Sequence, residues 1–239
     1  MLAILKKELN LFFGTPIGYL VIGIFLLVNG LFLWVFKGDF NILNAGFADL
    51  TNFFYVTPWF FIFLIPAITM RTFSDEIRLG TIEIIKTKPI SNWEIVTGKY
   101  LGSFLLIILA LIPTISYLFT ITQLAATPQN IDFGSIVGSY FGLLFLASAF
   151  TAIGLFTSTL SNNQIVAFIL GVTLSFFMFY GFEALADLNV FRDFDLRNLG
   201  LYARFASIGR GVIDTKDLVY FISVTFFFLW LTKNNFDLK

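Results

Sequence analysis

Few residues of this chain are suited to catalysis. Its 239 residues include no His and no Cys, which excludes imidazole bases, thiolate nucleophiles, disulfides and most transition-metal sites. The formal net charge is zero, so there is no basic footprint for nucleic acid. The polar residues that stand out gather in one segment, residues 71–99: Glu76, Arg78, Gly80, Thr81, Glu83 and Pro89. The hypothesis they raise is a partner-binding segment.

The pattern of residues 71–99 predicts a short helix between two turns. The preceding helix should end near Gly80, because glycine caps helix C-termini, and a second helix over residues 81–88 should stop at Pro89. Three isoleucines give this second helix an apolar side. Two interpretations stay open: a rigid helix that docks into a groove of a partner, or a loop helix that only anchors the molecule.

Two short motifs superficially resemble nucleotide-binding loops. The run from Gly80 to Thr87 has Ile85 where a phosphate-binding loop has its second glycine, and that side chain obstructs the backbone cradle. The run Leu160–Gln164, LSNNQ, is similar to the ATPase signature LSGGQ but lacks both glycines. Residues 161–164 instead fit a capping box that starts a helix. The energy for any transport must therefore come from a partner.

The distribution of charge predicts a membrane protein. From Phe133 to Phe182 the chain runs 50 residues without a charged side chain, and a charge at the centre of a helical span costs about 2.5–3.5 kcal/mol. Charged residues make up 13% of the chain, against about 25% in soluble domains. The fold class expected is an all-α integral membrane protein with one membrane domain.

The uncharged runs predict six transmembrane helices, since a span needs about 20 apolar residues. They are expected at about 17–36, 53–70, 101–124, 134–157, 164–183 and 217–232. Residues 91–94 fit a capping box from Ser91 to Glu94, which starts a helix that runs directly into the third span. Pro66 and Pro113 should kink the second and third spans. No span has an ionisable residue in its interior, so coupling to an ion gradient is not expected.

Two amphipathic segments flank these spans. Residues 2–14 place Leu2, Leu5, Leu9 and Phe12 at helical spacing, which predicts an amphipathic helix that lies in the interface before the first span. Residues 183–216 mix aromatic residues with arginines, which predicts amphipathic helices on the outer surface.

The positive-inside rule predicts that both termini are cytoplasmic. Six spans put the termini on one side, with nine Lys and Arg residues: Lys6, Lys7, Arg71, Arg78, Lys86, Lys88, Lys99, Lys233 and Lys239. The other side has six: Lys37, Arg192, Arg197, Arg204, Arg210 and Lys216.

The segment 71–99 resembles the cytoplasmic loop of ABC-2 type permeases, the membrane subunits of type V ABC transporters. The resemblance rests on the pattern Glu76-x-Arg78-x-Gly80-Thr81-x-Glu83, then Pro89, then Gly98-Lys99 entering a span. The stretch from Arg210 to Phe221 resembles the one before the last span in that family. The opening Lys6-Lys7-Glu8-Leu9, with Pro16-x-Gly18-Tyr19, is similar to a narrower group that includes gliding-motility permeases (GldF) and NosY-like permeases.

The resemblance implies a type V ABC exporter transmembrane domain in the bacterial inner membrane. It implies that residues 81–88 form a coupling helix on a separate ABC ATPase subunit, which binds ATP and Mg²⁺, whereas this chain binds no cofactor. Glu76, Arg78, Gly80, Thr81, Glu83 and Pro89 become the transmission region, and Ser158, Ser161 and Asn162 a second cytoplasmic contact. Six spans are half a pathway, which implies a sister permease or a second copy as partner. The outer segment 183–216 is implied to re-enter the outer leaflet and cap the pathway.

The function expected is a permease subunit that couples ATP hydrolysis on its partner to export or mechanical work, in gliding motility. The alternative is a non-transporting structural component of a motility or secretion apparatus, which shares the same loop. A lipid-modifying intramembrane enzyme is disfavoured, because the spans contain no paired carboxylates. The arginines of the outer segment leave open a contact with a partner or a lipid-like substrate.

Overall fold

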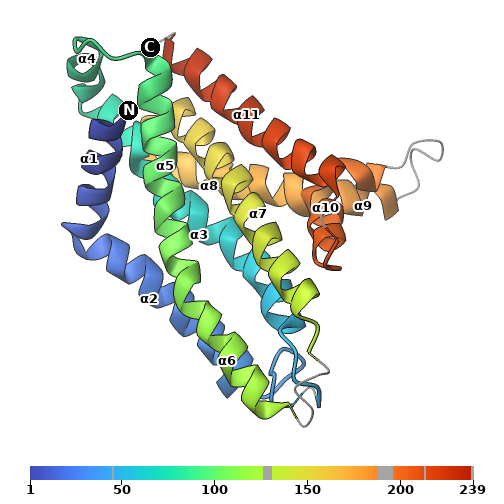
Figure 1. Ribbon diagram of the computed structural model, residues 1–239. Coiled ribbons are helices and arrows are strands. Elements are labelled where there is room, and N and C mark those ends of the chain that lie inside the picture. Colours follow the sequence, from blue (N-terminus) through green and yellow to red (C-terminus); the bar gives the residue numbers. More distant parts are fainter. Residues whose placement is uncertain (45, 126–130, 188–195, 213, 238–239) are drawn as a thin grey trace.

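The computed structural model describes residues 1–239 except 45, 126–130, 188–195, 213 and 238–239. Every regular element in these described ranges is helical (Figure 1). Six helices there are long and apolar enough to cross a membrane, as the sequence predicts: Pro16–Val35, Thr51–Arg78, Asn92–Leu124, Phe133–Leu160, Gln164–Asp187 and Thr215–Asp237.

Several spans are built from more than one helical segment. The first joins α2 (Pro16–Gly30) to a π-helical turn, Leu31–Val35. The third joins α5 (Asn92–Leu111) through a 3₁₀ turn at Ile112–Thr114 to α6 (Ile115–Leu124), so the helix changes at Pro113, where a kink is predicted. The fifth joins α8 (Gln164–Phe176) through a π-helical turn, Phe177–Gly181, to α9 (Phe182–Asp187).

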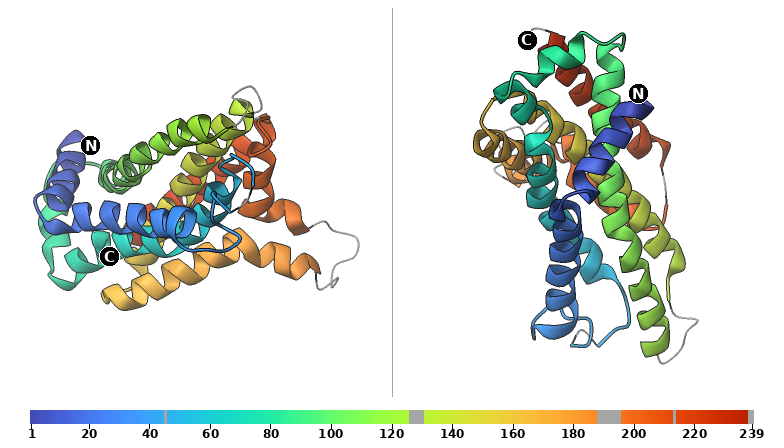
Figure 2. Two further views of the ribbon diagram at one scale, coloured as in Figure 1. Left: turned by 90° about the horizontal axis from the view of Figure 1, so that it is seen from below. Right: turned by 90° about the vertical axis from the view of Figure 1, so that its left-hand side faces the viewer.

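The centre of the bundle is the pair α3 (Thr51–Arg78) and α7 (Phe133–Leu160), which are the most buried spans. Gly154 of α7 permits their close approach, because a Cβ built there lies 2.1 Å from Oγ1 of Thr69. Helix α8 packs against both, with Gly171 close to Pro66 and Thr157. Helices α2 and α8 are the least buried spans and lie on the outside of this pair (Figure 2).

The helices reach beyond the apolar runs that predict them. Helix α3 continues past residue 70 to Arg78 and stays helical through Pro66. Helix α5 begins at Asn92, with Ser91 as its N-cap in a complete capping box with Glu94. Both limits agree with the predicted turn near Gly80 and the predicted capping box at Ser91. Hydropathy marks the apolar layer, whereas a capped helix continues into the polar region until a turn stops it. Both helices therefore project past the apolar layer and hold α4 (Thr81–Lys86) between them.

Helix α1 (Leu2–Phe13) packs on the bundle through Ile4, Glu8 and Phe12, which are buried. Of the predicted apolar residues, Phe12 lies on this buried face, whereas Leu2 is 73% exposed. Glycines of α5 explain the contact, because a Cβ on Gly102 lies 2.6 Å from Cβ of Glu8. The turn between α1 and α2 follows at Gly14 and Thr15.

The described part of the outer segment also packs on the bundle. After a 3₁₀ turn at Leu196–Leu199, α10 (Leu201–Ile208) buries Leu201, Phe205 and Ile208. Gly142 of α7 admits Phe205, whose ring carbons lie 3.1 Å from a Cβ built at that glycine. Arg192, with the rest of residues 188–195, lies outside the described residues.

Both termini and α4 lie at one end of the molecule, whereas the ends of α2 and α6 lie at the other (Figures 1 and 2). The last span, α11 (Thr215–Asp237), returns the chain to the end that carries α4. This end contains the segment 71–99.

Candidate functional site

Helix α4 (Thr81–Lys86) is a short helix that lies outside the six spans. Gly80, at φ +69°, ends α3 and lets the chain reverse into α4. The hydroxyl of Thr81 donates to the backbone oxygen of Glu76 at 3.4 Å, across this turn. Ile82 points into the bundle and is 6% exposed, whereas Glu83 is exposed and Ile84 is 62% exposed. The outward surface of α4 therefore presents one acidic and one apolar side chain.

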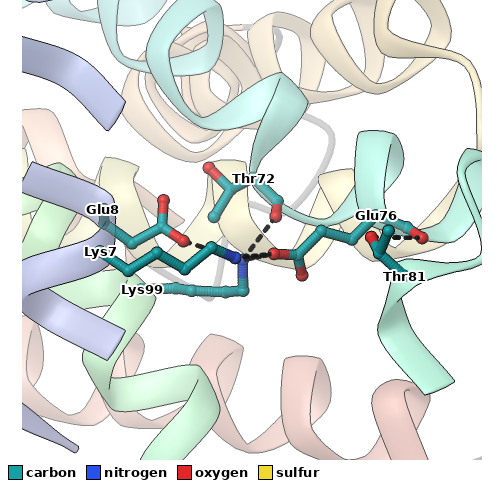
Figure 3. Close-up of polar contacts among 6 residues, drawn as sticks. All are labelled: Lys7, Glu8, Thr72, Glu76, Thr81 and Lys99. Atoms are coloured by element: carbon teal, nitrogen blue, oxygen red, sulfur yellow. Dashed lines mark hydrogen bonds and ion pairs between the residues drawn. The ribbon is translucent and has the colours of Figure 1, made fainter. Parts of the chain in front are cut away.

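A buried ionic cluster lies near the start of α4 (Figure 3). The ammonium of Lys99, whose side chain is 1% exposed, lies 3.0 Å from Oε1 of Glu8 and 2.9 Å from Oε1 of Glu76. It also donates to the backbone oxygen of Thr72 at 2.8 Å. Lys7 reaches the same Glu76 oxygen at 2.6 Å. Each ammonium and carboxylate thus faces an opposite charge.

The cluster ties three helices together. Glu8 belongs to α1, Glu76 to α3 and Lys99 to α5, so α1 is linked by charge to both neighbours. Leaving one member of such a buried set unpaired is expensive, which restricts independent movement of these helices. The other carboxylate oxygen of Glu76 is buried without a hydrogen bond. Glu76, which is predicted to belong to a transmission region, therefore lies within this cluster and does not point outward.

Arg78 reaches the second predicted contact region. Asp75 pairs with Arg78 at 2.9 Å and accepts a hydrogen bond from the side chain of Gln164, in the first turn of α8. Arg78 and Asn162 line one surface hollow of about 400 Å³. The structure thus brings the end of α3 and the turn between α7 and α8 together, although 89 positions separate Asp75 from Gln164.

The turn between α7 and α8 differs in detail from its prediction. The N-cap of α8 is Asn163, whose side chain accepts from the Ile165 amide, whereas Ser161 accepts from the Asn163 amide. Ser158 is fully buried, and its hydroxyl donates to the Leu155 carbonyl at 2.7 Å. At the surface of this turn, Asn162 and Asn163 are exposed and Ser161 is half-buried.

A groove of about 490 Å³ runs between α1, the end of α3 and α4. Its lining is mostly apolar and includes Leu11 of α1 and Ile85 of α4, with the charged residues Lys7, Arg71 and Glu76. Pro89, which follows α4, is exposed and lies outside this groove. Apolar lining with a few charged groups is the surface type that receives a helix of another protein.

This end of the molecule offers few groups suited to catalysis. Among the described residues, no group of three or more Asp, Glu, His or Cys side chains could hold a metal ion. The glycine-containing run at Gly80–Thr87 folds into α4 and its flanking turns rather than into a phosphate-binding loop. What the arrangement offers is an exposed helix attached to buried, charge-linked spans.

These features define a multi-pass membrane domain that has an anchored helix at one end. Residues 10–195 match the family model described as ABC-2 family transporter protein, and the chain belongs to this family. ABC-2 proteins supply the membrane domain of an ABC transporter, and ATP hydrolysis belongs to a partner subunit. No curated protein matches the chain.

Proposed function

We propose that this chain is the permease subunit of an ABC exporter and that α4 is the helix through which the ATPase subunit moves it. The observation that carries the proposal is the position of α4. It lies outside the six spans, exposes Glu83 and Ile84, and is joined to α3 through Gly80. An exposed helix that is attached to buried spans can pass a movement on to them.

The transmission residues take separate roles in this mechanism. Glu83 faces the ATPase, Gly80 and Thr81 fix the angle between α3 and α4, and Glu76 joins α3 to α1 and α5. ATP binding closes the ATPase pair and displaces α4, and α3 tilts with it because the buried cluster resists separation of the three helices. The free energy comes from contacts that differ between the two states.

Arg78 and Pro89 complete this region. Arg78 holds the end of α3 near the turn between α7 and α8 through Asp75. Pro89 lies in the short connection between α4 and Ser91, which is the N-cap of α5. Ser161 and Asn162 form the second contact with the ATPase, and Ser158 supports that turn from inside.

The end that carries α4 faces the cytoplasm of a bacterial inner membrane in this proposal. The excess of Lys and Arg on that side supports it. Because the chain has no Cys, single introduced thiols report the topology. Phe47→Cys, at a position 78% exposed on the opposite side, should react with an impermeant maleimide in intact cells, whereas Ile84→Cys, at 62%, should react only after permeabilisation. Reaction of Ile84→Cys in intact cells would contradict the orientation.

The pathway needs two such membrane subunits, so a second copy of this chain or a sister permease is the expected membrane partner. The similarity of the Lys6–Leu9 opening to gliding-motility permeases of the GldF group supports a role in gliding. The alternative, a structural component of a motility or secretion apparatus, uses the same α4 contact. Inactivating the hydrolytic residue of the partner ATPase distinguishes them, because only the transporter loses function.

Purification from the native membrane tests the central claim. A tagged chain should retain a partner that hydrolyses ATP and is identified by mass spectrometry. Glu83→Lys should abolish this association by reversing an exposed charge. Gly80→Pro should do the same, because proline fixes φ near −65° and Gly80 needs +69°. Lys37→Glu, exposed at the opposite end, is the matched charge-reversal control. Inserted Glu83→Lys protein that still retains stoichiometric ATPase would refute the assignment of α4.

A further inference from the structure

The last turn of α11 contacts α4 and the neighbouring helices α3 and α5. The ammonium of Lys86, the last residue of α4, donates to the backbone oxygen of Phe236 at 3.0 Å and lies 4.7 Å from the centre of the Phe236 ring. That ring is 1% exposed and packs on Phe73 of α3, with 5.5 Å between ring centres. The side chain of Asn92, at the start of α5, donates to Asp237.

The same turn also reaches α7. The side chain of Asn235 donates to both oxygens of Thr159, at 3.0 Å to the carbonyl and 2.9 Å to the hydroxyl. One helical turn thus contacts α3, α4, α5 and α7. It contacts α4 at the end away from Gly80, so α4 has two attachments to the membrane domain.

The first turns of α11 contact α10 and the residue before it through an ion pair, a cation–π contact and a hydrogen bond. Asp217, whose side chain is 2% exposed, pairs with Arg204 of α10 at 3.0 Å. The Arg204 guanidinium also lies 5.5 Å from the centre of the Tyr220 ring. The Tyr220 hydroxyl donates to the carbonyl of Leu199, just before α10. A buried carboxylate paired with an arginine favours a fixed relation between these two helices, because separating them would leave the carboxylate unpaired.

We propose that α11 is a second transmission element that connects α4 to α10. Lys86 and Phe236 are its positioning residues at the end of α11 near α4, and Arg204 and Asp217 at the end near α10. Its 23 residues correspond to about 35 Å of helix, and Figure 1 shows it running without a break from the end of the molecule that carries α4 to α10. The proposal rests on the proposed function, in which α4 receives the movement.

Two routes then leave α4. The first passes through Gly80 into α3, at the centre of the bundle. The second passes through Lys86 into α11 and so to α10, which covers α7 in the outer segment. The second route ends in residues 196–239, which lie outside the matched range 10–195. Its consequence is that displacement of α4 alters the environment of α10.

The test uses the full chain in complex with the ATPase that co-purifies from its native membrane, in lipid nanodiscs. Ala206→Cys places one thiol on the exposed side of α10 in a chain without other Cys. Its reaction rate with a maleimide is measured in the apo state and after trapping with MgATP and vanadate. We expect at least a threefold change in rate on trapping.

Lys86→Met, at a half-buried position, removes the hydrogen bond and the ring contact. It should abolish the rate change while the ATPase remains bound, and Lys86→Arg should restore it. Phe236→Leu keeps most of the buried volume and should reduce the change at least twofold. Lys37→Met and Phe227→Ala, both exposed and away from these contacts, should respond as the unmodified complex does.

The outcomes separate the two proposals. If the complex forms and the rate at Ala206→Cys responds equally with Lys86 and with Lys86→Met, transmission through α11 is refuted and the role of α4 stands. If the reporter does not respond in the unmodified complex, α10 does not follow α4 and the inference is likewise refuted. If no ATPase associates with the chain, the proposed function fails and the inference falls with it.

Discussion

Replacing Lys99 by Met should destabilise the protein by about 3–5 kcal/mol, the usual cost of removing one partner from a buried ion pair. Lys99 is 1% exposed and contacts carboxylate oxygens of Glu8 at 3.0 Å and of Glu76 at 2.9 Å. Met fills a similar volume, so the change removes the charge and leaves little cavity. Glu76 keeps Lys7 at 2.6 Å, whereas Glu8, 5% exposed, keeps no other cation among the described residues.

The cost should therefore be concentrated on Glu8. If so, Glu8→Gln in the Lys99→Met background removes the stranded charge and should recover more than half of the lost stability. The double variant is thus expected to be more stable than Lys99→Met alone, although it contains one substitution more. Glu8→Gln alone leaves Lys99 with Glu76 and the Thr72 carbonyl, so its cost should be smaller, about 1–3 kcal/mol.

Thermal unfolding in detergent measures these differences. For a chain of this length, 1 kcal/mol corresponds to about 2–4 °C, so Lys99→Met should lower the midpoint by about 6–20 °C. Lys37→Met, an exposed lysine at the opposite end, is the control and should stay within about 2 °C. A midpoint for Lys99→Met equal to the control, or a double variant no more stable than the single one, would refute the role of the cluster.

Three further substitutions test the packing around it. Gly154→Val should lower the free energy of unfolding by about 1–3 kcal/mol through overpacking, since a Cβ at Gly154 lies 2.1 Å from Oγ1 of Thr69. Adding Thr69→Ala should recover part of that loss in a thermal melt. Strictly additive stability changes for the two substitutions would contradict the contact. Gly102→Leu should push α1 off α5, because its Cβ lies 2.6 Å from that of Glu8; maleimide labelling of Ile4→Cys, buried at 9%, should then accelerate, and an unchanged rate would speak against this packing. Ser91→Ala should lower stability by about 0.5–2 kcal/mol through loss of the α5 capping box, measured as faster hydrogen exchange in the first turn of α5 than in the unmodified chain.

The sequence predicts the six spans well because the physics behind them is local. The bilayer excludes charge, so each uncharged run of sufficient length marks a helix. The capping box at Ser91 and the turn at Gly80 are equally local, and the structure confirms both. Hydropathy alone ends the second span at residue 70, whereas the glycine signal places the helix end near Gly80, and α3 extends to Arg78.

The buried cluster could not be predicted from spacing along the chain, since 91 positions separate Glu8 from Lys99. A signal was nevertheless present in α1. Ile4, Glu8 and Phe12 share one helix face, so a carboxylate between two apolar residues indicated a buried partner. The prediction of an interfacial helix rests on Leu2, Leu5, Leu9 and Phe12, and it does not include the alignment of Glu8 with Ile4 and Phe12. Which cation completed the pair depended on how α1 and α5 pack.

The second contact region shows the same limit. The exposed Asn162 and the neighbouring Gln164 lie beside the end of α3, as a shared surface for a partner requires. Ser158, four residues earlier in sequence than Asn162, faces the opposite way because it is still within α7. Polarity alone could not separate the two, since a serine that donates to its own helix carbonyl is satisfied inside the bundle.

In the proposed mechanism, the location of the ionic contacts explains how an apolar bundle transmits a directed movement. Within the bilayer, lipid tails are as apolar as the helices, so burial alone gives little preference for one helix register over another. A charged pair does, because sliding one partner away leaves the other buried and unpaired. The chain places such pairs at helix ends, as at Lys99 between α1, α3 and α5 and at Asp217 between α10 and α11. The long middle sections of α3 and α7 rely instead on close contact at small residues such as Gly154. When α4 is displaced, the helix ends joined by ion pairs should therefore move together, whereas the middle sections of α3 and α7 can tilt.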